Sequence, residues 1–126
     1  MIAFKYYFSE DDYFPVIPFY GIKGFKKIKF YGLIDSGASI SVFREEIAQE
    51  LGIEIEKGEL TYLSGVGGRI KGYLHRLKIE VAGKKFFCPV IFSHEYLVSF
   101  NLLGRQEFFP RFKIIFEEKN KEVNLR

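Results

Sequence analysis

The sequence contains no tryptophan, one cysteine and two histidines among its 126 residues. Because Cys88 is alone, the chain cannot form an internal disulfide, which fits a reducing compartment. His75 and His94 are the only other soft metal ligands, and they lack the close spacing of a zinc site. We therefore expect no bound metal, and we interpret these three side chains as structural or surface residues.

The sequence also lacks a long apolar run and a strong excess of either charge. No stretch approaches the length of a membrane span, and acidic residues follow the short apolar start of residues 1–14, which is not typical of a signal peptide. The net charge of +3, from 19 basic and 16 acidic residues, is too small and too dispersed to indicate nucleic-acid binding. We expect a soluble protein of the cytoplasm that binds neither a membrane nor nucleic acid.

Apolar and aromatic residues, in contrast, are plentiful. The chain is 48% hydrophobic and 18% aromatic, with 15 phenylalanines and 8 tyrosines, a composition typical of a folded protein with a substantial core. It has no internal repeat, no low-complexity tract and no linker. We therefore expect residues 1–126 to form a single domain.

Alternating and β-branched stretches predict a series of short strands. In residues 25–34, the side chains of Ile28, Phe30 and Ile34 share one face while lysines occupy the other. Residues 13–20 carry two prolines, which indicates an edge or irregular strand. Further strands are predicted at residues 60–63, 70–81, 86–92 and 112–116, with a hairpin turn at 82–84.

One convincing helix is predicted after residue 40. Ser41 is its expected N-cap, Glu45 and Glu46 lie in its first turns, and Gly52 ends it. Its apolar face is expected to comprise Ile47, Ala48 and Leu51.

The C-terminal part is less regular. A second short helix is expected within residues 101–110, where Pro110 would stop it. Residues 117–126 either return as the second strand of a hairpin or form a loose end. Short strands, close turns and these helices together indicate an all-β fold class, mostly strands with one or two short helices.

Three short motifs stand out in the order LIDSGA (33–38), SGVGG (64–68) and LLGR (102–105). The first places a carboxylate at the end of an apolar strand, on a turn of small residues. The second is a glycine-rich tip between two predicted strands, and the third is an apolar pair that runs into a glycine. Taken alone, each has an ordinary explanation: an Asx turn, a tight hairpin and core packing.

In this order and spacing, the three motifs resemble those of the retropepsin-like aspartic proteases, the single-domain relatives of pepsin. The resemblance covers residues 13–117. It implies a closed β-barrel of the retropepsin-like acid protease fold and an aspartic endopeptidase that acts as a homodimer on extended peptides or proteins. It assigns catalysis to Asp35, support of the catalytic loop to Ser36, Gly37 and Ala38, a substrate-binding flap to Gly65, Val66, Gly67 and Gly68, and packing behind the site to Leu102, Leu103, Gly104 and Arg105.

The chemistry explains why one aspartate per chain would suffice. Water is a poor nucleophile, so one group must take its proton while another polarises the peptide carbonyl. Two close carboxylates that share one proton perform both tasks, because they cannot both ionise. The chain offers one aspartate in this setting, so Asp35 would face Asp35 of a second copy across a two-fold axis, and no cofactor is needed.

The residues around Asp35 have separate expected roles. The hydroxyl of Ser36 would bond across the axis to the partner's backbone, and Gly37 would let a backbone amide approach the carboxylate. Ala38 offers no hydroxyl to stabilise the ionised pair, so the pair should lose its shared proton at a higher pH and activity should extend to weakly acidic or near-neutral pH. The flap glycines would let the backbone pair with a peptide, with Val66 covering it.

The sequence departs from the viral members of this family. Ser39 stands where they often carry a second aspartate that pairs with the arginine, so Arg105 needs another partner, such as Glu107 or a carbonyl. The chain extends beyond both ends of the matched core, and viral enzymes interleave their termini in the dimer, so the form of the dimer is open. No pepsin-like flap tyrosine is assignable, although Tyr62 and Tyr73 flank the tip.

Two other hypotheses stay open from the sequence. A catalytically inactive retropepsin-like module would bind peptides or dimerise without cutting. The intact motif at Asp35 favours the enzyme, because a pure binder has no use for a buried paired carboxylate. An unrelated small β-barrel that binds a basic or acidic ligand would instead be a monomer that tolerates Asp35→Asn.

Overall fold

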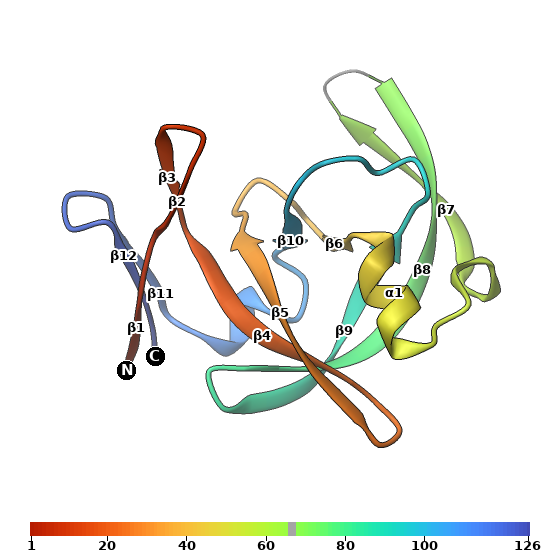
Figure 1. Ribbon diagram of the computed structural model, residues 1–126, viewed down its shortest axis with the longest axis horizontal. Coiled ribbons are helices and arrows are strands. Elements are labelled where there is room, and N and C mark those ends of the chain that lie inside the picture. Colours follow the sequence, from red (N-terminus) through yellow and green to blue (C-terminus); the bar gives the residue numbers. More distant parts are fainter. Residues whose placement is uncertain (66–67) are drawn as a thin grey trace.

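The computed structural model describes residues 1–65 and 68–126 (Figure 1). The helical elements are α1 (Glu45–Leu51) and two 3-10 turns, η1 (Ile55–Lys57) and η2 (Phe109–Arg111). The strands are β1 (Ile2–Lys5), β2 (Tyr7–Ser9), β3 (Asp12–Phe14), β4 (Val16–Lys23), β5 (Lys26–Ile34), β6 (Ser41–Phe43), β7 (Glu59–Gly65), β8 (Gly68–Val81), β9 (Lys84–Phe92), β10 (Asn101–Leu103), β11 (Ile114–Glu117) and β12 (Glu122–Leu125). The predicted all-β fold class is confirmed.

The main sheet closes on itself into a ring of strands, called the ring below. Its strands follow the order β4-β5-β10-β6-β9-β8-β7, and β4 pairs a second time with β8, where Tyr20 lies opposite Glu80. Residues 13–20 were expected to form an edge or irregular strand: the stretch is irregular, because Pro15 separates β3 from β4, but Tyr20 is not at an edge, since it has neighbours on both sides. Pro18 is tolerated because β4 pairs only with β5 at that point, so its missing N–H interrupts no second ladder.

Aromatic side chains fill the interior of this ring. In β5, Phe30 and Ile34 are buried while the lysines of the strand are exposed, as the alternation predicted. Phe43 packs between Phe19 and Phe92, with ring centroids 5.0 and 6.3 Å away. These rings hold the strands together beneath the loops that follow β5 and β9.

Helix α1 forms as predicted except at its start. Its buried face comprises Ile47, Ala48 and Leu51. Gly52 ends it in the left-handed region, with φ of 72°. The predicted N-cap is wrong, because Arg44 holds that position without a side-chain bond and Ser41 lies in β6. Strand β6 pairs with β9 on one side and β10 on the other, so the backbone stays extended to Phe43.

The predicted second helix over residues 101–110 is also wrong. After β10 the chain makes turns, and Pro110 lies inside the short η2 instead of stopping a helix. The amides of Arg105 and Gln106 donate to the carbonyls of Ala38 and Ser39, over 2.9 and 3.0 Å. Glu107 lies in the left-handed region, with φ of 65°, so the backbone departs from the helical conformation within this segment.

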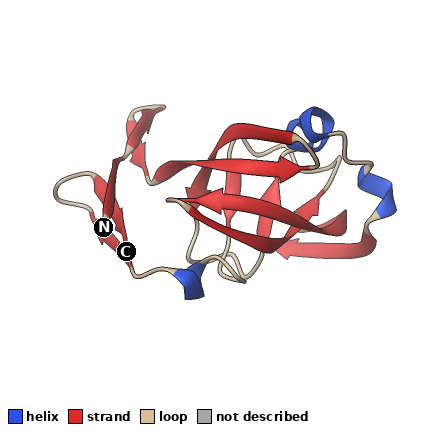
Figure 2. Cartoon of the chain, turned by 90° about the horizontal axis from the view of Figure 1, so that it is seen from below, coloured by secondary structure: helices blue, strands red, loops and turns tan. Residues whose placement is uncertain are grey.

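The two ends of the chain form a separate sheet. Strand β12 lies in the centre, between β1 and β11, so residues 117–126 return as a hairpin strand. The termini lie side by side at one end of the molecule (Figures 1 and 2). Val123 and Leu125 are buried in the same hydrophobic cluster as the interior of the ring. The terminal sheet is therefore part of the folded unit.

Within residues 1–65 and 68–126, no helix is long and apolar enough to cross a membrane. The same residues contain no cluster of three or more histidine, cysteine, aspartate or glutamate side chains suited to a metal ion. Cys88 is free and fully buried in β9, so it serves packing.

The burial of Leu125 gives the first prediction. Leu125→Ala should lower the free energy of unfolding by about 2–5 kcal/mol, because it leaves a cavity between the terminal sheet and the ring. Phe116→Ala in neighbouring β11 is the control, since that ring is 39% exposed. Urea unfolding would measure both. Equal, small losses would show that the terminal sheet does not stabilise the domain.

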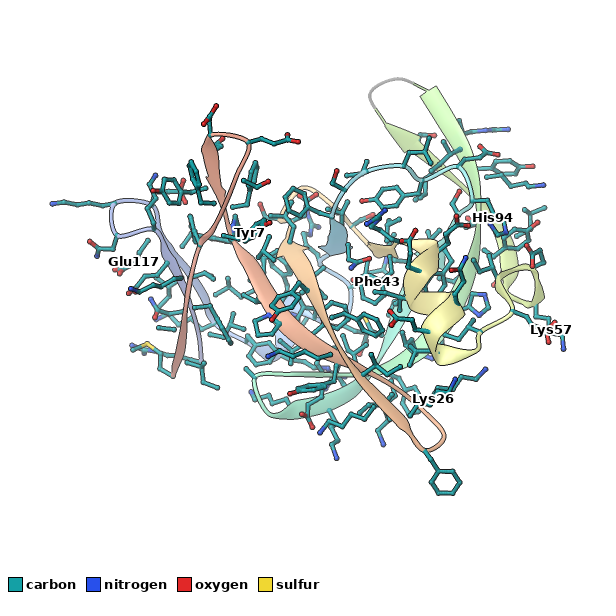
Figure 3. The ribbon with its side chains drawn as sticks, in the orientation of Figure 1. Tyr7, Lys26, Phe43, Lys57, His94 and Glu117 are labelled. Carbon is teal, nitrogen blue, oxygen red and sulfur yellow. The ribbon has the colours of Figure 1, made fainter. Side chains whose placement is uncertain are left out.

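His94 links three parts of the fold. Its Nδ1 lies 2.6 Å from Oε2 of Glu45 on α1, and its Nε2 lies 2.5 Å from Oε1 of Glu56 in η1 (Figure 3). Hydrogen bonds to Glu56 and Glu45 raise the pKa of His94 above its usual value, and the bond to His94 lowers the pKa of Glu56. The bridge is complete when His94 is protonated and Glu56 is ionised.

This bridge makes stability depend on pH. The raised pKa of His94 gives a contribution that is full below about pH 6.5 and is lost as the pH rises through the raised value. The lowered pKa of Glu56 gives a contribution that is lost as the pH falls through that lowered value. His94→Ala should therefore lower the melting temperature more near pH 5.5 than near pH 9, as thermal melts at about these two pH values would show. A deficit of the same size at both pH values would contradict the bridge.

Candidate active site

Asp35 stands at the end of β5, where the chain leaves the ring. Strands β5 and β10 run parallel, with Leu33 opposite Leu102 and Ile34 opposite Leu103. The amide of Asp35 donates to the carbonyl oxygen of Leu103 over 3.0 Å, which continues the ladder by one residue. Strand β10 therefore fixes the backbone up to the candidate catalytic side chain.

Small residues bring backbone amides onto Asp35. The amide of Gly37 donates to Oδ1 of Asp35 over 2.9 Å, and the amide of Ala38 donates to the carbonyl of Asp35 over 3.2 Å. A Cβ at position 37 would lie 3.3 Å from Oδ1, which leaves little room for any side chain. The turn thus sets the orientation of the carboxylate.

Leu103 and Gly104 support this turn from behind. Leu103 is fully buried, and a Cβ on Gly104 would lie only 2.4 Å from the carbonyl carbon of Ile40. The amide of Gly104 donates to Oγ of Ser41 over 3.0 Å, and Sγ of Cys88 lies 3.7 Å from the same oxygen. The backbone at Leu103 and Gly104 therefore packs directly against the backbone of the loop that follows Asp35.

Sequence reasoning missed two residues in this region. Ser41 was interpreted as a helix cap, yet it is fully buried and accepts the Gly104 hydrogen bond. A lone hydroxyl between two apolar residues was the available signal. Tyr96, in the loop between β9 and β10, donates to the carbonyl of Phe100 over 2.8 Å. Burial, and to a smaller extent the charge of Asp35, raises the pKa of Tyr96 to about 12, and no sequence pattern marked this residue.

In the single chain, the catalytic loop is open to solvent. Asp35 is half-buried, and Ser36 and Gly37 are exposed. The hydroxyl of Ser36 has no hydrogen-bond partner among the residues that the structure describes. A dry, buried pair of carboxylates therefore requires a second copy of the chain.

Arg105 lies on the surface and does not pair with Glu107. Its side chain is exposed, and Glu107 pairs with Arg111 instead, with 2.7 Å between Oε2 and Nη2. Of the two partners expected for Arg105, Glu107 is therefore wrong. With Ser39 in place of an acid, the loop offers no carboxylate at that position to draw the guanidinium inward.

The predicted flap is the hairpin of β7 and β8. Gly65 at the end of β7 pairs with Gly68 at the start of β8, and the expectations for Val66 and Gly67 lie outside the described residues. Gly68 has φ of 118°, a conformation that favours glycine. The outer part of this hairpin projects beyond the ring (Figure 1).

A sizeable cavity lies away from Asp35. It has a volume of about 980 Å³ and lies between the terminal strands and the ring, where Tyr6, Phe14, Phe30 and Phe100 line it. Asp35 is absent from its lining.

Known proteins provide a comparison for this geometry. A family model described as aspartyl protease matches residues 22–105. Among solved structures, a retropepsin-like aspartic protease from Rickettsia conorii aligns with a TM-score of 0.72 and 22% identity, over 98% of each chain. The EIAV protease complexed with an inhibitor aligns with a TM-score of 0.63 and 18% identity, over 83% of this chain and 94% of that one. No curated protein matches at a significant level.

The close approach of Gly104 gives a prediction. Gly104→Ala should destabilise the fold by at least about 2 kcal/mol, because its Cβ would clash with the backbone of Ile40 and nothing there can rotate away. Gly65→Ala is the matched control, since an added Cβ there meets nothing within 4 Å. Chemical denaturation would compare the two variants, and similar unfolding midpoints would contradict the described contact.

Proposed function

The chain belongs to the aspartyl protease family and has the retropepsin-like fold, and we propose that it is an endopeptidase active as a homodimer, with Asp35 of each copy forming the catalytic pair. The observation that carries this proposal is the rigid turn at the end of β5. Leu103 holds the backbone of Asp35, Gly37 orients its carboxylate, and the loop stays accessible in the single chain. Family membership excludes the unrelated small barrel.

In the proposed mechanism, the two carboxylates share one proton. One accepts a proton from water while the other donates to the peptide carbonyl, so the water attacks as the carbonyl becomes polarised. Ser36 of each copy bonds across the axis and locks the two loops together. Ala38 leaves the ionised pair without a hydroxyl, which extends activity toward neutral pH. No cofactor takes part.

The proposed substrate is an extended peptide with apolar side chains. It lies between Asp35 and the β7–β8 hairpin, and the backbone of that hairpin pairs with it in the manner of strand addition. Leu97 and Val98, which follow Tyr96, are exposed by 87% and 49% and offer apolar contact for such a chain. The single buried Cys88 supports a cytoplasmic location.

The proposed dimer keeps both terminal sheets intact. Strand β12 is already paired on both sides within one chain, so a partner strand has access only to the outer edges of β1 and β11. Interleaving the termini of two copies would first require these ladders to break. We therefore place the contact that completes the site at the Asp35 loops.

Replacing Asp35 by asparagine tests the function directly. Asp35→Asn keeps the shape and removes the ionisable group, so it should reduce cleavage of an unfolded protein substrate by at least about 1,000-fold. The assay runs from acid to neutral pH, with Asp11→Asn, in the exposed turn between β2 and β3, as the matched control.

The outcomes separate the hypotheses. Cleavage by wild type alone would support the catalytic pair, and its pH range would test the role of Ala38. Equal cleavage by both would point to a contaminating protease. A folded wild type that cuts nothing at any pH would overturn the endopeptidase in favour of an inactive peptide-binding module.

A further inference from the structure

The loop after β9 holds the base of the β7–β8 hairpin with its side chains. Regular pairing between β8 and β9 ends at Tyr73 and Phe92. Two residues further out, Oγ of Ser93 donates to the carbonyl of Lys71, and Oε1 of Glu95 accepts from the amide of Lys71 over 3.2 Å. Side chains thus replace the backbone of β9 where that strand turns away.

The clip formed by Ser93 and Glu95 on Lys71 is tightly built. Ser93 is fully buried, and its Oγ also accepts from the amide of Glu95 over 3.1 Å. Gly72, next to Lys71, passes so close to β9 that a Cβ there would lie 2.6 Å from Cγ2 of Ile91. The hairpin therefore leaves the ring at one defined point.

The loop that carries the clip is anchored elsewhere. His94 lies between Ser93 and Glu95 in sequence, and its ring is held by Glu45 and Glu56. Two residues after His94, burial and, to a smaller extent, the charge of Asp35 raise the pKa of Tyr96. The same short loop thus connects helix α1, the base of the hairpin and the surroundings of the catalytic loop.

Beyond Lys71, the described residues of β8 pair only with β7. A two-stranded ribbon has little stability of its own, so its direction is set where it joins the larger sheet. We propose that Ser93 and Glu95 are positioning residues that fix the β7–β8 hairpin at Lys71 and thereby set how it lies over a peptide bound at Asp35. This inference rests on the proposed function and adds to it.

Glu95 is the residue to change, because it is exposed and its removal leaves the core intact. Glu95→Ala removes the acceptor, whereas Glu95→Gln keeps an oxygen that can accept from Lys71. Glu50→Ala, at an exposed position of α1 outside the hairpin, is the control. Two measurements are made on all four chains: amide hydrogen exchange at Lys71, and kcat and KM for cleavage of the oxidised insulin B chain.

We expect Glu95→Ala to speed exchange at Lys71 and to raise KM about tenfold, with kcat changed less than about twofold, because Asp35 itself is untouched. Glu95→Gln and Glu50→Ala should behave as wild type in both measurements. Recovery by glutamine would distinguish loss of the hydrogen bond from loss of general stability.

The failures are distinguishable. If exchange at Lys71 is unchanged in Glu95→Ala, the clip does not hold the hairpin and the inference is overturned. If exchange speeds up but KM stays constant, the hairpin position is irrelevant to substrate binding, which also overturns it while the protease stands. If wild type neither cuts nor binds the insulin B chain, the proposed function and the role of the clip in substrate binding fail together.

Discussion

The backbone of Gly104 lies against the backbone of Ile40 with no space for a side chain, and the geometry around Asp35 depends on this contact. It lets β10 run alongside β5 up to Leu103, whose carbonyl receives the amide of Asp35. It also lets the amides of Arg105 and Gln106 donate hydrogen bonds to the carbonyls of the third and fourth residues after Asp35. Close packing of two backbones is stiff, because neither has a rotamer to change.

The rigid backbone at Asp35 contrasts with the β7–β8 hairpin. The buried Leu103 and Ser41 support the loop that carries Asp35, whereas the described outer part of the β7–β8 hairpin has one neighbouring strand. The loop after β9 connects the two regions, with hydrogen bonds to Lys71 at one end and Tyr96 near Asp35. In the proposed protease, a site that admits a peptide and then holds it needs a rigid loop at Asp35 and a hairpin whose direction is set at its base.

The folded chain leaves the loop at Asp35 open to solvent. Its core is closed, its termini pair with each other, and the cavity lined by Tyr6 and Phe30 lies away from Asp35. A paired site would bury the side chains of Asp35 and Ser36. In the single chain, Asp35 is half-buried and Ser36 is exposed. In the proposed homodimer, the carboxylate pair takes one Asp35 from each copy, so the assembly would bury these groups.

Local patterns in the sequence determined strands β4, β5, β7, β8, β9 and β11, the face and end of helix α1, and the three motifs in their order. These depend on residues close together in the chain: alternation in β5, a glycine in the left-handed region at position 52, and small residues around Asp35. Only the tertiary structure decided that Ser41 is a buried acceptor, that residues 104–108 form turns, that Tyr20 has a strand on each side, and that Glu107 pairs with Arg111. Each of these depends on a partner that only folding brings near, or on one of several partners within reach, and a local pattern carries no information on that choice.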